Sequence, residues 1–527
     1  MAAKPQRRVA VTSSLPAPNM GINDLDSFAA MPPDYCIDLV NFFPANGALN
    51  TRNGYKEWVT NLGGRVYTLI NFAMVDGTSE LFACTNEGIW NVTSSTDAPV
   101  MVAALTYGAV EYCQYSNIAG NYLVVTNGVD AALLYDGTTW VSFTASDTPT
   151  NPGEIKGVDP STLAGVTSYK GRLWFVEQDS LTVWYLPYDS IGGEAQPFYL
   201  GGSLPRGGSI TEIITWSLDS GAGMDDKLCF YSSQGELLIY TGTDPADATT
   251  WQLESMFFIS APIGTSPSME LGGDVILLTR NGIITLSSVV KGEASIAVSN
   301  SALSKRISRT MNRIVNSGTF VPDWEIMNLP SLQAILVIVP QTSTDRPRQY
   351  VMNSLTGAWT RFDLPARCGA LHQGKFFFGD DNGRVLLYGN TFTDNDLLDG
   401  TTGAEITCYA FTAYNYFGDP TTNKHFKMVR PIFQGVTPPG YLLKLNMDYD
   451  LAALPGNPPS PQEGAGDALW DTALWDNAFW KSSGTVFRPW TGVTGLGFCA
   501  ALLIKVIASE TSSFTAIETV YEAGAAI

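Results

Sequence analysis

The chain has 527 residues and a formal net charge of −20, so its length allows about three domains or one large propeller with additions. Hydrophobic residues make up 45% of the chain and charged residues only 15%, a balance typical of an ordered globular protein. The negative charge excludes avid binding of nucleic acid over the whole surface, because phosphates would be repelled. No apolar run reaches the roughly 18 residues of a membrane span, and the N-terminus lacks the apolar stretch of a signal peptide. We therefore expect a soluble protein made in a cytoplasm.

Residues 1–60 form a polar arm followed by a turn-rich docking segment. Lys4, Arg7 and Arg8 give the arm a local positive charge, and it is either disordered or ordered against a neighbouring subunit. The docking segment reads Pro32-Pro33, Asn41-Phe42-Phe43-Pro44 and Gly47-x-Leu49-x-x-Arg52-x-Gly54-Tyr55. Its Asn-Gly pairs predict successive turns. We expect Arg52 to anchor to carboxylates or backbone carbonyls at the edge of a neighbouring sheet.

Residues 61–400 repeat one unit, an apolar run, a polar turn and a second apolar run. In Val275–Ser288, the turn residues Asn281-Gly282 supply the left-handed backbone that a tight hairpin needs. The same pattern recurs at residues 81–92, 122–135, 172–186, 228–240 and 375–388, with a longer variant at 334–362. A spacing of roughly 40 to 60 residues is typical of a β-propeller, and the hairpins predict about seven blades, with six or eight left open. The long polar connections Thr144–Val166 and Asp189–Ser209 are expected either to be functional loops or to contact partners.

One amphipathic helix is predicted inside the repeats, from Ser301 to Val315. Its apolar stripe at helical spacing consists of Leu303, Ile307, Met311 and Ile314. Four cations accompany the stripe: Lys305, Arg306, Arg309 and Arg313. They form either a solvated face or a contact with DNA or an acidic partner.

Residues 401–527 lose the hairpin rhythm and predict a separate C-terminal β domain. Its strands are expected in 406–418, 424–436, 441–451, 498–509 and 514–524. Trp470, Trp475 and Trp480 lie five residues apart between them, a period that fits neither helix nor strand and predicts turns. These tryptophans either pack against their own domain or form an aromatic contact site for a sugar.

The sequence contains no recognisable catalytic or cofactor motif. Its seven cysteines are scattered singly, a pattern that indicates buried thiols rather than a disulfide framework or a zinc site. They are Cys36, Cys84, Cys113, Cys229, Cys368, Cys408 and Cys499. Neither of the two histidines lies in a nucleophile motif, no Walker motif is present, and Asp136-Gly137-Thr138-Thr139-Trp140 is a single faint Asp-box of the sialidase kind. We expect no cofactor, no metal and no enzymatic activity.

The docking segment, together with the repeated hairpins, resembles the tail nozzle or packaged-DNA-stabilisation proteins of short-tailed bacteriophages. The resemblance implies an all-β protein in which the segment precedes a β-propeller. It further implies a virion protein of the tail, forming a homo-oligomeric ring, a hexamer, that attaches to adaptor proteins below the portal and lies near tail fibres. Double-stranded DNA would pass through the ring without tight binding, which an acidic lumen favours.

Two other functions remain open from the sequence. A receptor-binding or glycan-binding tail adhesin would use the Trp470 to Trp480 run as its contact surface. A propeller glycosidase would need a pair of catalytic carboxylates, and the sequence does not single out such a pair.

Overall fold

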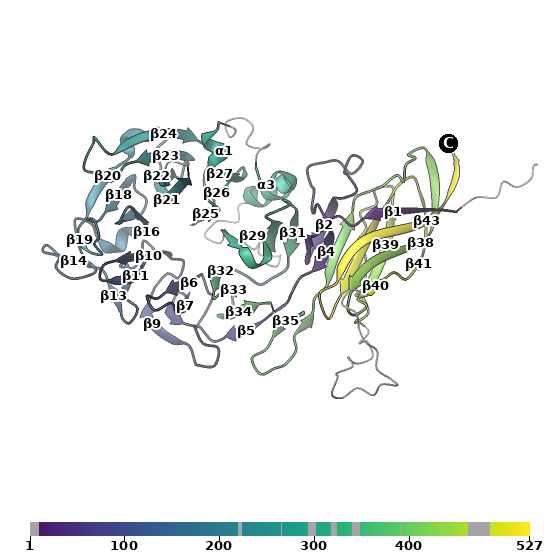
Figure 1. Ribbon diagram of the computed structural model, residues 1–527, viewed down its shortest axis with the longest axis horizontal. Coiled ribbons are helices and arrows are strands. Elements are labelled where there is room, and N and C mark those ends of the chain that lie inside the picture. The colour runs from purple at the N-terminus through teal and green to yellow at the C-terminus, as the bar shows by residue number, and fades with distance from the viewer. Residues whose placement is uncertain are drawn as a thin grey trace, which may run out of the picture.

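A computed structural model describes most of the chain and is almost entirely β-sheet (Figure 1). The residues that the structure describes are 10–219, 224–264, 266–292, 302–317, 324–339, 348–389, 391–461 and 485–526. A ring of sheets forms one body, and a two-layered β-sandwich forms the other. The predicted all-β fold with a β-propeller is thus confirmed, whereas the second body combines C-terminal strands with strands of the N-terminal segment that was predicted to be separate from them.

The ring begins with four consecutive antiparallel sheets of four strands each. Their strands are β6 (Thr68–Ala73), β7 (Ser79–Cys84), β8 (Gly88–Asn91) and β9 (Val100–Ala104); β10 (Glu111–Asn117), β11 (Gly120–Thr126), β12 (Leu133–Tyr135) and β13 (Trp140–Ser142); β16 (Leu163–Tyr169), β17 (Arg172–Glu177), β18 (Thr182–Tyr185) and β20 (Gln196–Tyr199); and β21 (Ile210–Asp219), β22 (Met224–Ser232), β23 (Glu236–Thr241) and β24 (Gln252–Phe258). The predicted hairpins are the second and third strands of these sheets.

The ring continues with a three-stranded sheet and with strands that belong to two larger sheets. These strands are β25 (Ser268–Leu271), β26 (Asp274–Thr279) and β27 (Gly282–Thr285); β28 (Glu325–Leu329), β29 (Ala334–Val339), β30 (Arg348–Asn353) and β31 (Trp359–Phe362); and β32 (Cys368–His372), β33 (Lys375–Gly379), β34 (Val385–Tyr388) and β5 (Tyr55–Val59). In the hairpin of β26 and β27, Gly282 has a φ of +132° and Asn281 has an ordinary φ. The prediction of a left-handed backbone at both residues was therefore wrong for Asn281.

The sheets close into a ring because the N-terminal strand β5 pairs antiparallel with β34. A separate hydrophobic cluster lies between each sheet and the next along the chain. One more cluster joins the sheet of β32 to β34 back to the sheet of β6 and β7, through residues such as Val59, Leu69 and Phe377. Packing of apolar side chains between neighbouring sheets thus continues around the whole circle.

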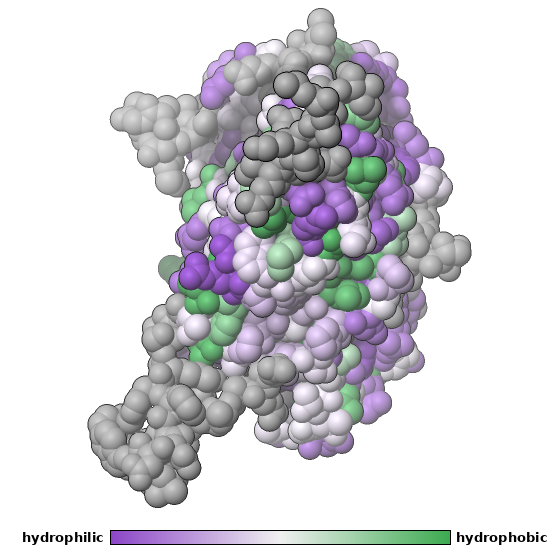
Figure 2. Space-filling view, turned by 90° about the vertical axis from the view of Figure 1, so that its right-hand side faces the viewer, coloured by the Kyte–Doolittle hydropathy of each residue, from purple (hydrophilic) through white to green (hydrophobic). Residues whose placement is uncertain are grey.

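The second body packs two sheets face to face. The first layer contains β1 (Ala10–Pro16), β3 (Phe42–Ala45), β4 (Ala48–Thr51), β38 (Thr422–Gly435), β40 (Thr485–Phe487), β41 (Thr491–Gly497) and β43 (Ser513–Ala526). The second contains β2 (Cys36–Val40), β37 (Cys408–Thr412), β39 (Gly440–Met447) and β42 (Ala500–Ile507). Apolar side chains such as Phe433 and Ile504 fill the space between the layers. Figure 2 looks onto this side of the molecule and shows small, separate hydrophobic patches among hydrophilic residues.

The two bodies share strands. β2 lies beside β31 of the propeller, so one eight-stranded sheet runs from the propeller into the sandwich. Strand β35 (Thr393–Asp396) pairs with β5 and with β36 (Ala404–Glu405) at the edge of the last sheet of the ring. The N-terminal strands β1 to β4 therefore belong to the sandwich, and β5 belongs to the propeller.

Two predicted connections contain short strands instead of open loop. β14 (Thr144–Ala145), β15 (Glu154–Lys156) and β19 (Gly193–Glu194) form a parallel three-stranded sheet. The helices are α1 (Leu286–Val290), α3 (Ser308–Asn316) and the 3₁₀ turns η1 (Pro160–Thr162), η2 (Gly201–Ser203), η3 (Lys305–Ile307) and η4 (Pro330–Leu332). None of the helices in the described ranges is long and apolar enough to cross a membrane.

Candidate functional site

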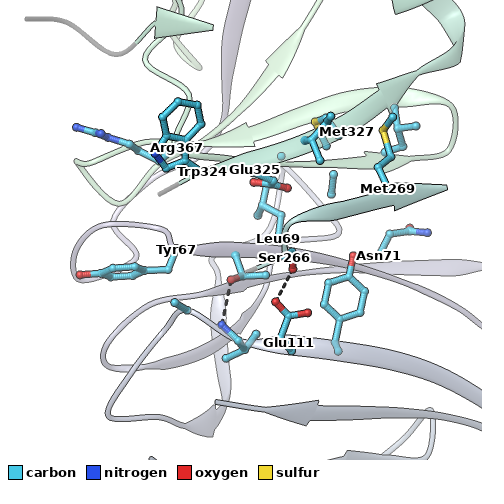
Figure 3. Close-up of a pocket in the computed structure, with 18 of the residues that line it drawn as sticks. Tyr67, Leu69, Asn71, Glu111, Ser266, Met269, Trp324, Glu325, Met327 and Arg367 are labelled. Atoms are coloured by element: carbon cyan, nitrogen blue, oxygen red, sulfur yellow. Dashed lines mark hydrogen bonds between the residues drawn. The ribbon is translucent and has the colours of Figure 1, made fainter. Parts of the chain in front are cut away.

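The axis of the propeller holds a cavity with a volume of about 700 Å³. Its wall comes from the first strands of the surrounding sheets, β6, β10, β25, β28 and β32 (Figure 3). A second cavity of about 340 Å³ adjoins it beside β10, β16 and β21 and shares the lining residues Glu111, Tyr112 and Glu270. Most first strands contact the first strand of the next sheet, namely β10 with β16, β16 with β21, β25 with β28, β28 with β32 and β32 with β6, so the inner wall is built from strands.

Four glutamates from four different strands face this space. Glu111 begins β10, Glu212 lies in β21, Glu270 lies in β25 and Glu325 begins β28. The Ser266 hydroxyl, just before β25, donates a hydrogen bond to Glu111 (Figure 3). The Ser268 hydroxyl donates to Oε1 of Glu212 at 2.7 Å. Hydroxyl donors from the β25 segment therefore hold carboxyl groups of two other sheets.

Burial raises the pKa of three of these carboxyl groups. The pKa of Glu111 is raised to about 7, although the hydrogen bond from Ser266 opposes the shift. Burial, assisted by the charge of Glu111, raises the pKa of Glu212 and that of Glu325 to about 8. Removing a carboxylate from water disfavours its charged form, so Glu212 and Glu325 are mostly protonated near pH 7 and Glu111 is about half protonated.

The cavity also has a cationic end. Arg367 donates two hydrogen bonds to Asp381 Oδ2, from Nε at 3.0 Å and from Nη2 at 2.7 Å. Arg65 lies 3.7 Å from Asp381 Oδ1 and its guanidinium is 4.6 Å from the ring centre of Tyr67. Asp381 therefore binds both guanidinium groups at this end, away from the glutamates.

The predicted basic stretch is helical, first as η3 and then as α3, and its apolar stripe packs into the core. Its N-cap residue, Ile307, has no polar side chain, and Asp24 of the N-terminal segment takes its place. The Asp24 carboxylate accepts hydrogen bonds from the backbone N–H of Arg309 at 3.3 Å and of Thr310 at 2.6 Å. The negative charge at a helix N-terminus is stabilising, so this cap ties the N-terminal segment to the propeller.

The four predicted cations have different surroundings. The Arg306 guanidinium forms an ion pair with Asp26 at 3.0 Å and lies 4.8 Å from the ring centre of Tyr35. Arg309 and Arg313 are exposed and Lys305 is half-buried. The contact of Lys305, Arg306, Arg309 and Arg313 with DNA or an acidic partner stays a prediction. Trp470, Trp475 and Trp480 lie outside the described residues.

Arg52 is buried in the connection between sandwich and propeller, with a fully buried side chain. Its Nη1 and Nη2 donate to the two carboxylate oxygens of Asp394 at 2.7 and 2.6 Å, and its Nε donates to Asn41 Oδ1 at 2.8 Å. Further hydrogen bonds reach the carbonyl oxygens of Asn53 and Asp363. The prediction that Arg52 anchors to carboxylates and backbone carbonyls is confirmed.

The cysteines and the Asp-box candidate have structural environments. All seven thiols are free, and all except the half-buried Cys113 are buried. Asp136 accepts hydrogen bonds from the backbone N–H and hydroxyl groups of Thr138 and Thr139, which lower its pKa to about 2. This carboxylate stabilises a surface turn. Within the described ranges, no three His, Cys, Asp or Glu side chains come close enough together to hold a metal ion.

Sequence reasoning missed the axial glutamates. The signal is a glutamate next to an apolar residue in the first strand of several units, in Val110-Glu111-Tyr112, Thr211-Glu212-Ile213, Met269-Glu270-Leu271 and Trp324-Glu325-Ile326. These first strands mix polar and apolar residues, so the hairpin pattern did not include them.

Comparisons with known proteins identify no family for this chain. No protein-family model matches this chain, and no curated protein matches it. Among solved structures, YCF48 from Cyanidioschyzon merolae is 12% identical, with a TM-score of 0.36 over 64% of this chain and 98% of its own. The Cps50 (Swd1) β-propeller domain of Myceliophteria thermophila is 14% identical, with a TM-score of 0.37 over 64% of this chain and all of its own. At these TM-scores the likeness carries no argument, and the propeller is established by the ring of sheets itself.

Proposed function

We propose that this chain is a structural virion protein that forms the distal nozzle of a short phage tail. In this proposal, six copies form a ring that binds the adaptor proteins below the portal, next to the tail fibres. The ring retains the packaged DNA and passes it during ejection. The protein acts without enzymatic activity, is made in the host cytoplasm and functions in the virion tail.

The observation that carries the proposal is the place of the docking segment in the fold. The residues on which the resemblance to phage nozzle proteins rests lie where the chain leaves the sandwich and enters the propeller. Gly47 forms the turn between β3 and β4 with a φ of +76°. Gly54 passes so close to β35 that an added Cβ would lie 1.8 Å from the carbonyl oxygen of Thr393. The residues of the docking segment therefore lie at the junction of a propeller and a sandwich. This position supports an architecture shared with the nozzle proteins rather than a chance match of turn residues.

We further propose that the propeller has seven blades. Six sets of four strands, counting β28 to β31 and β32 to β34 with β5, support six of them. The three-stranded sheet β25 to β27 supports the seventh, because hydrophobic clusters join it to both neighbouring sheets.

The exposed cations of α3 are the proposed contact with DNA or with an acidic neighbouring subunit. Arg309 and Arg313 lie one helical turn apart on an otherwise acidic protein. Each subunit carries a net charge of −20, so a local cationic face would find complementary acidic surface on another copy of the ring.

The function is tested with particles that lack the protein. We expect such particles to package DNA and then lose it, and the wild-type protein supplied separately to restore retention. Stable, DNA-filled particles without the protein would overturn the proposal.

The contact is tested by charge reversal. Arg309→Glu with Arg313→Glu should impair ring assembly or genome retention while the isolated protein stays folded. Lys291→Glu, an exposed cation beyond α1, is the control and should have no effect. Unchanged particles from the double variant would remove the helix from the proposal.

The axial cavity does not favour a glycosidase. Glycoside hydrolysis needs one protonated carboxyl group and one ionised carboxylate, with pKa values pushed apart. Burial instead raises the pKa of Glu111, Glu212 and Glu325 together. The arrangement suits reversible protonation better than acid and nucleophile roles.

A further inference from the structure

The outermost strand of each propeller sheet has one edge that faces away from the ring. Such an edge presents unpaired backbone groups, and proteins protect it with charges, prolines, short strands or covering elements. β31 and β5 pair with β2 and β35, and α1 follows β27 and packs on its sheet. β13 has only three residues, β20 contains Pro197, and β24 carries the charge of Glu254. Each of these six outermost strands therefore has a protective feature.

Among the described sheets of the propeller, the one that ends in β9 is the least protected (Figure 1). The five residues of β9 include no charge and no proline, and β9 pairs only with β8. A bulge leaves Val102 without a partner on β8, and its side chain packs on the cluster between the first two sheets. The side chains of Val100 and Met101 nevertheless remain 61% and 49% exposed. An edge of this kind is a place where another strand can pair.

The chain around β9 is also poor in charge. Asp97 is the only charged residue between Gly88 and Val110, although charged residues make up 15% of the whole chain. The exposed Val141 of β13 extends this uncharged strip, because its neighbour Trp140 packs on the same cluster as Val102. Copies that each carry a net charge of −20 repel one another. An uncharged apolar strip is therefore a surface at which two copies can approach closely.

We propose that β9 and Val141 lie in the interface between neighbouring copies of this chain, where an extended strand of the next copy pairs with β9. The inference rests on the proposed ring and names a surface through which its copies associate. In a closed ring the two sides of each interface differ, so the strand that pairs with β9 is a different part of the next copy. Backbone hydrogen bonds would align the two strands, and burial of Val100 and Met101 would stabilise the contact.

β9 supplies only part of this interface. A stable interface between proteins buries roughly 1,200 to 2,000 Å² in total, which is more than a strand of five residues provides. The paired strands would therefore form an apolar centre surrounded by other contacts. Charges introduced at such a centre weaken association more than charges at the rim.

The test measures assembly of the full-length protein by light scattering over a range of concentrations, alone and with tail-adaptor complexes. Val100→Lys with Met101→Lys places two charges where the partner strand packs. This variant should raise the protein concentration needed for half-maximal assembly by about tenfold or more. Leu253→Lys is the matched control, because Leu253 is also an exposed apolar residue of an outermost strand, next to Glu254 of β24. It should leave assembly unchanged.

Hydrogen–deuterium exchange of the wild-type protein gives a second readout that needs no variant. Backbone amides in residues 98–105 should exchange more slowly in the assembled protein than in the dissociated protein, because pairing with another strand occupies them. Amides in residues 252–258, the β24 segment, should exchange equally in both states. This measurement decides the question even if the double lysine variant does not fold.

The outcomes separate this interface from the proposed ring. A wild-type protein that stays monomeric, alone and with the adaptor, would overturn both. Assembly that withstands both lysines in a variant with unchanged circular dichroism would overturn the β9 interface alone, as would equal exchange of residues 98–105 in the two states. Equal weakening by Leu253→Lys would indicate a general effect of charge at the propeller rim and would likewise overturn it.

Discussion

Replacing Arg52 by Met should destabilise the chain where propeller and sandwich meet. Arg52 donates hydrogen bonds to Asn41, to both oxygens of Asp394 and to the carbonyl oxygens of Asn53 and Asp363. Removing one partner of a buried ion pair costs about 3 to 5 kcal/mol. The Asp394 side chain is 21% exposed, so water can partly replace the guanidinium. We therefore expect a loss at the lower end, about 3 kcal/mol.

The assay is urea denaturation followed by tryptophan fluorescence, with the exposed pair of Lys156 and Glu194 as a control. Those two groups lie 3.7 Å apart on the surface, and Lys156→Met should cost less than about 1 kcal/mol. Arg52→Lys should fall between the two, because one ammonium group cannot reproduce the bidentate contact. An Arg52→Met variant no less stable than the Lys156→Met control would refute the reasoning.

Three further predictions concern pH, the helix cap and the thiols. The pKa values of Glu212 and Glu325 are raised on folding, so the stability that these groups contribute is lost as the pH rises from about 4.5 to 8. The thermal midpoint of unfolding should therefore fall over this pH window, and it should fall less in the Glu212→Gln variant. A pH dependence unchanged by that substitution would contradict the assignment. Asp24→Ala should lower the free energy of unfolding by about 1 kcal/mol and speed hydrogen exchange of the Thr310 backbone amide. An unchanged exchange rate would show that the Asp24 cap does not stabilise the helix. Denaturation without reductant should expose all seven thiols, and in the folded protein the half-buried Cys113 should react before the six buried thiols. Fewer than seven reactive thiols after denaturation would indicate disulfides.

The sequence predicts the middle strands of each sheet well. β29 is buried along its whole length, and such strands read as apolar runs because other sheets cover both of their faces. First strands such as β10, whose sequence is Glu-Tyr-Cys-Gln-Tyr-Ser-Asn, face the cavity and carry mixed residues. The hairpin pattern therefore missed them, and the glutamates on them.

Long-range pairings were equally hidden. Strand β5 closes the propeller by pairing with β34, more than 300 residues away, and Asp24 caps a helix that begins at Ser308. Local periodicity has no information about such partners. The parallel sheet of β14, β15 and β19 was also taken for loop, because strands of two or three residues leave no pattern.

The central claim is ring assembly on a tail adaptor. The most direct test measures the mass and shape of the purified protein by light scattering and negative-stain electron microscopy, alone and mixed with adaptor complexes from the same source. The nozzle account predicts six-fold rings or capped adaptors. A protein that remains monomeric and does not bind the adaptor would contradict it.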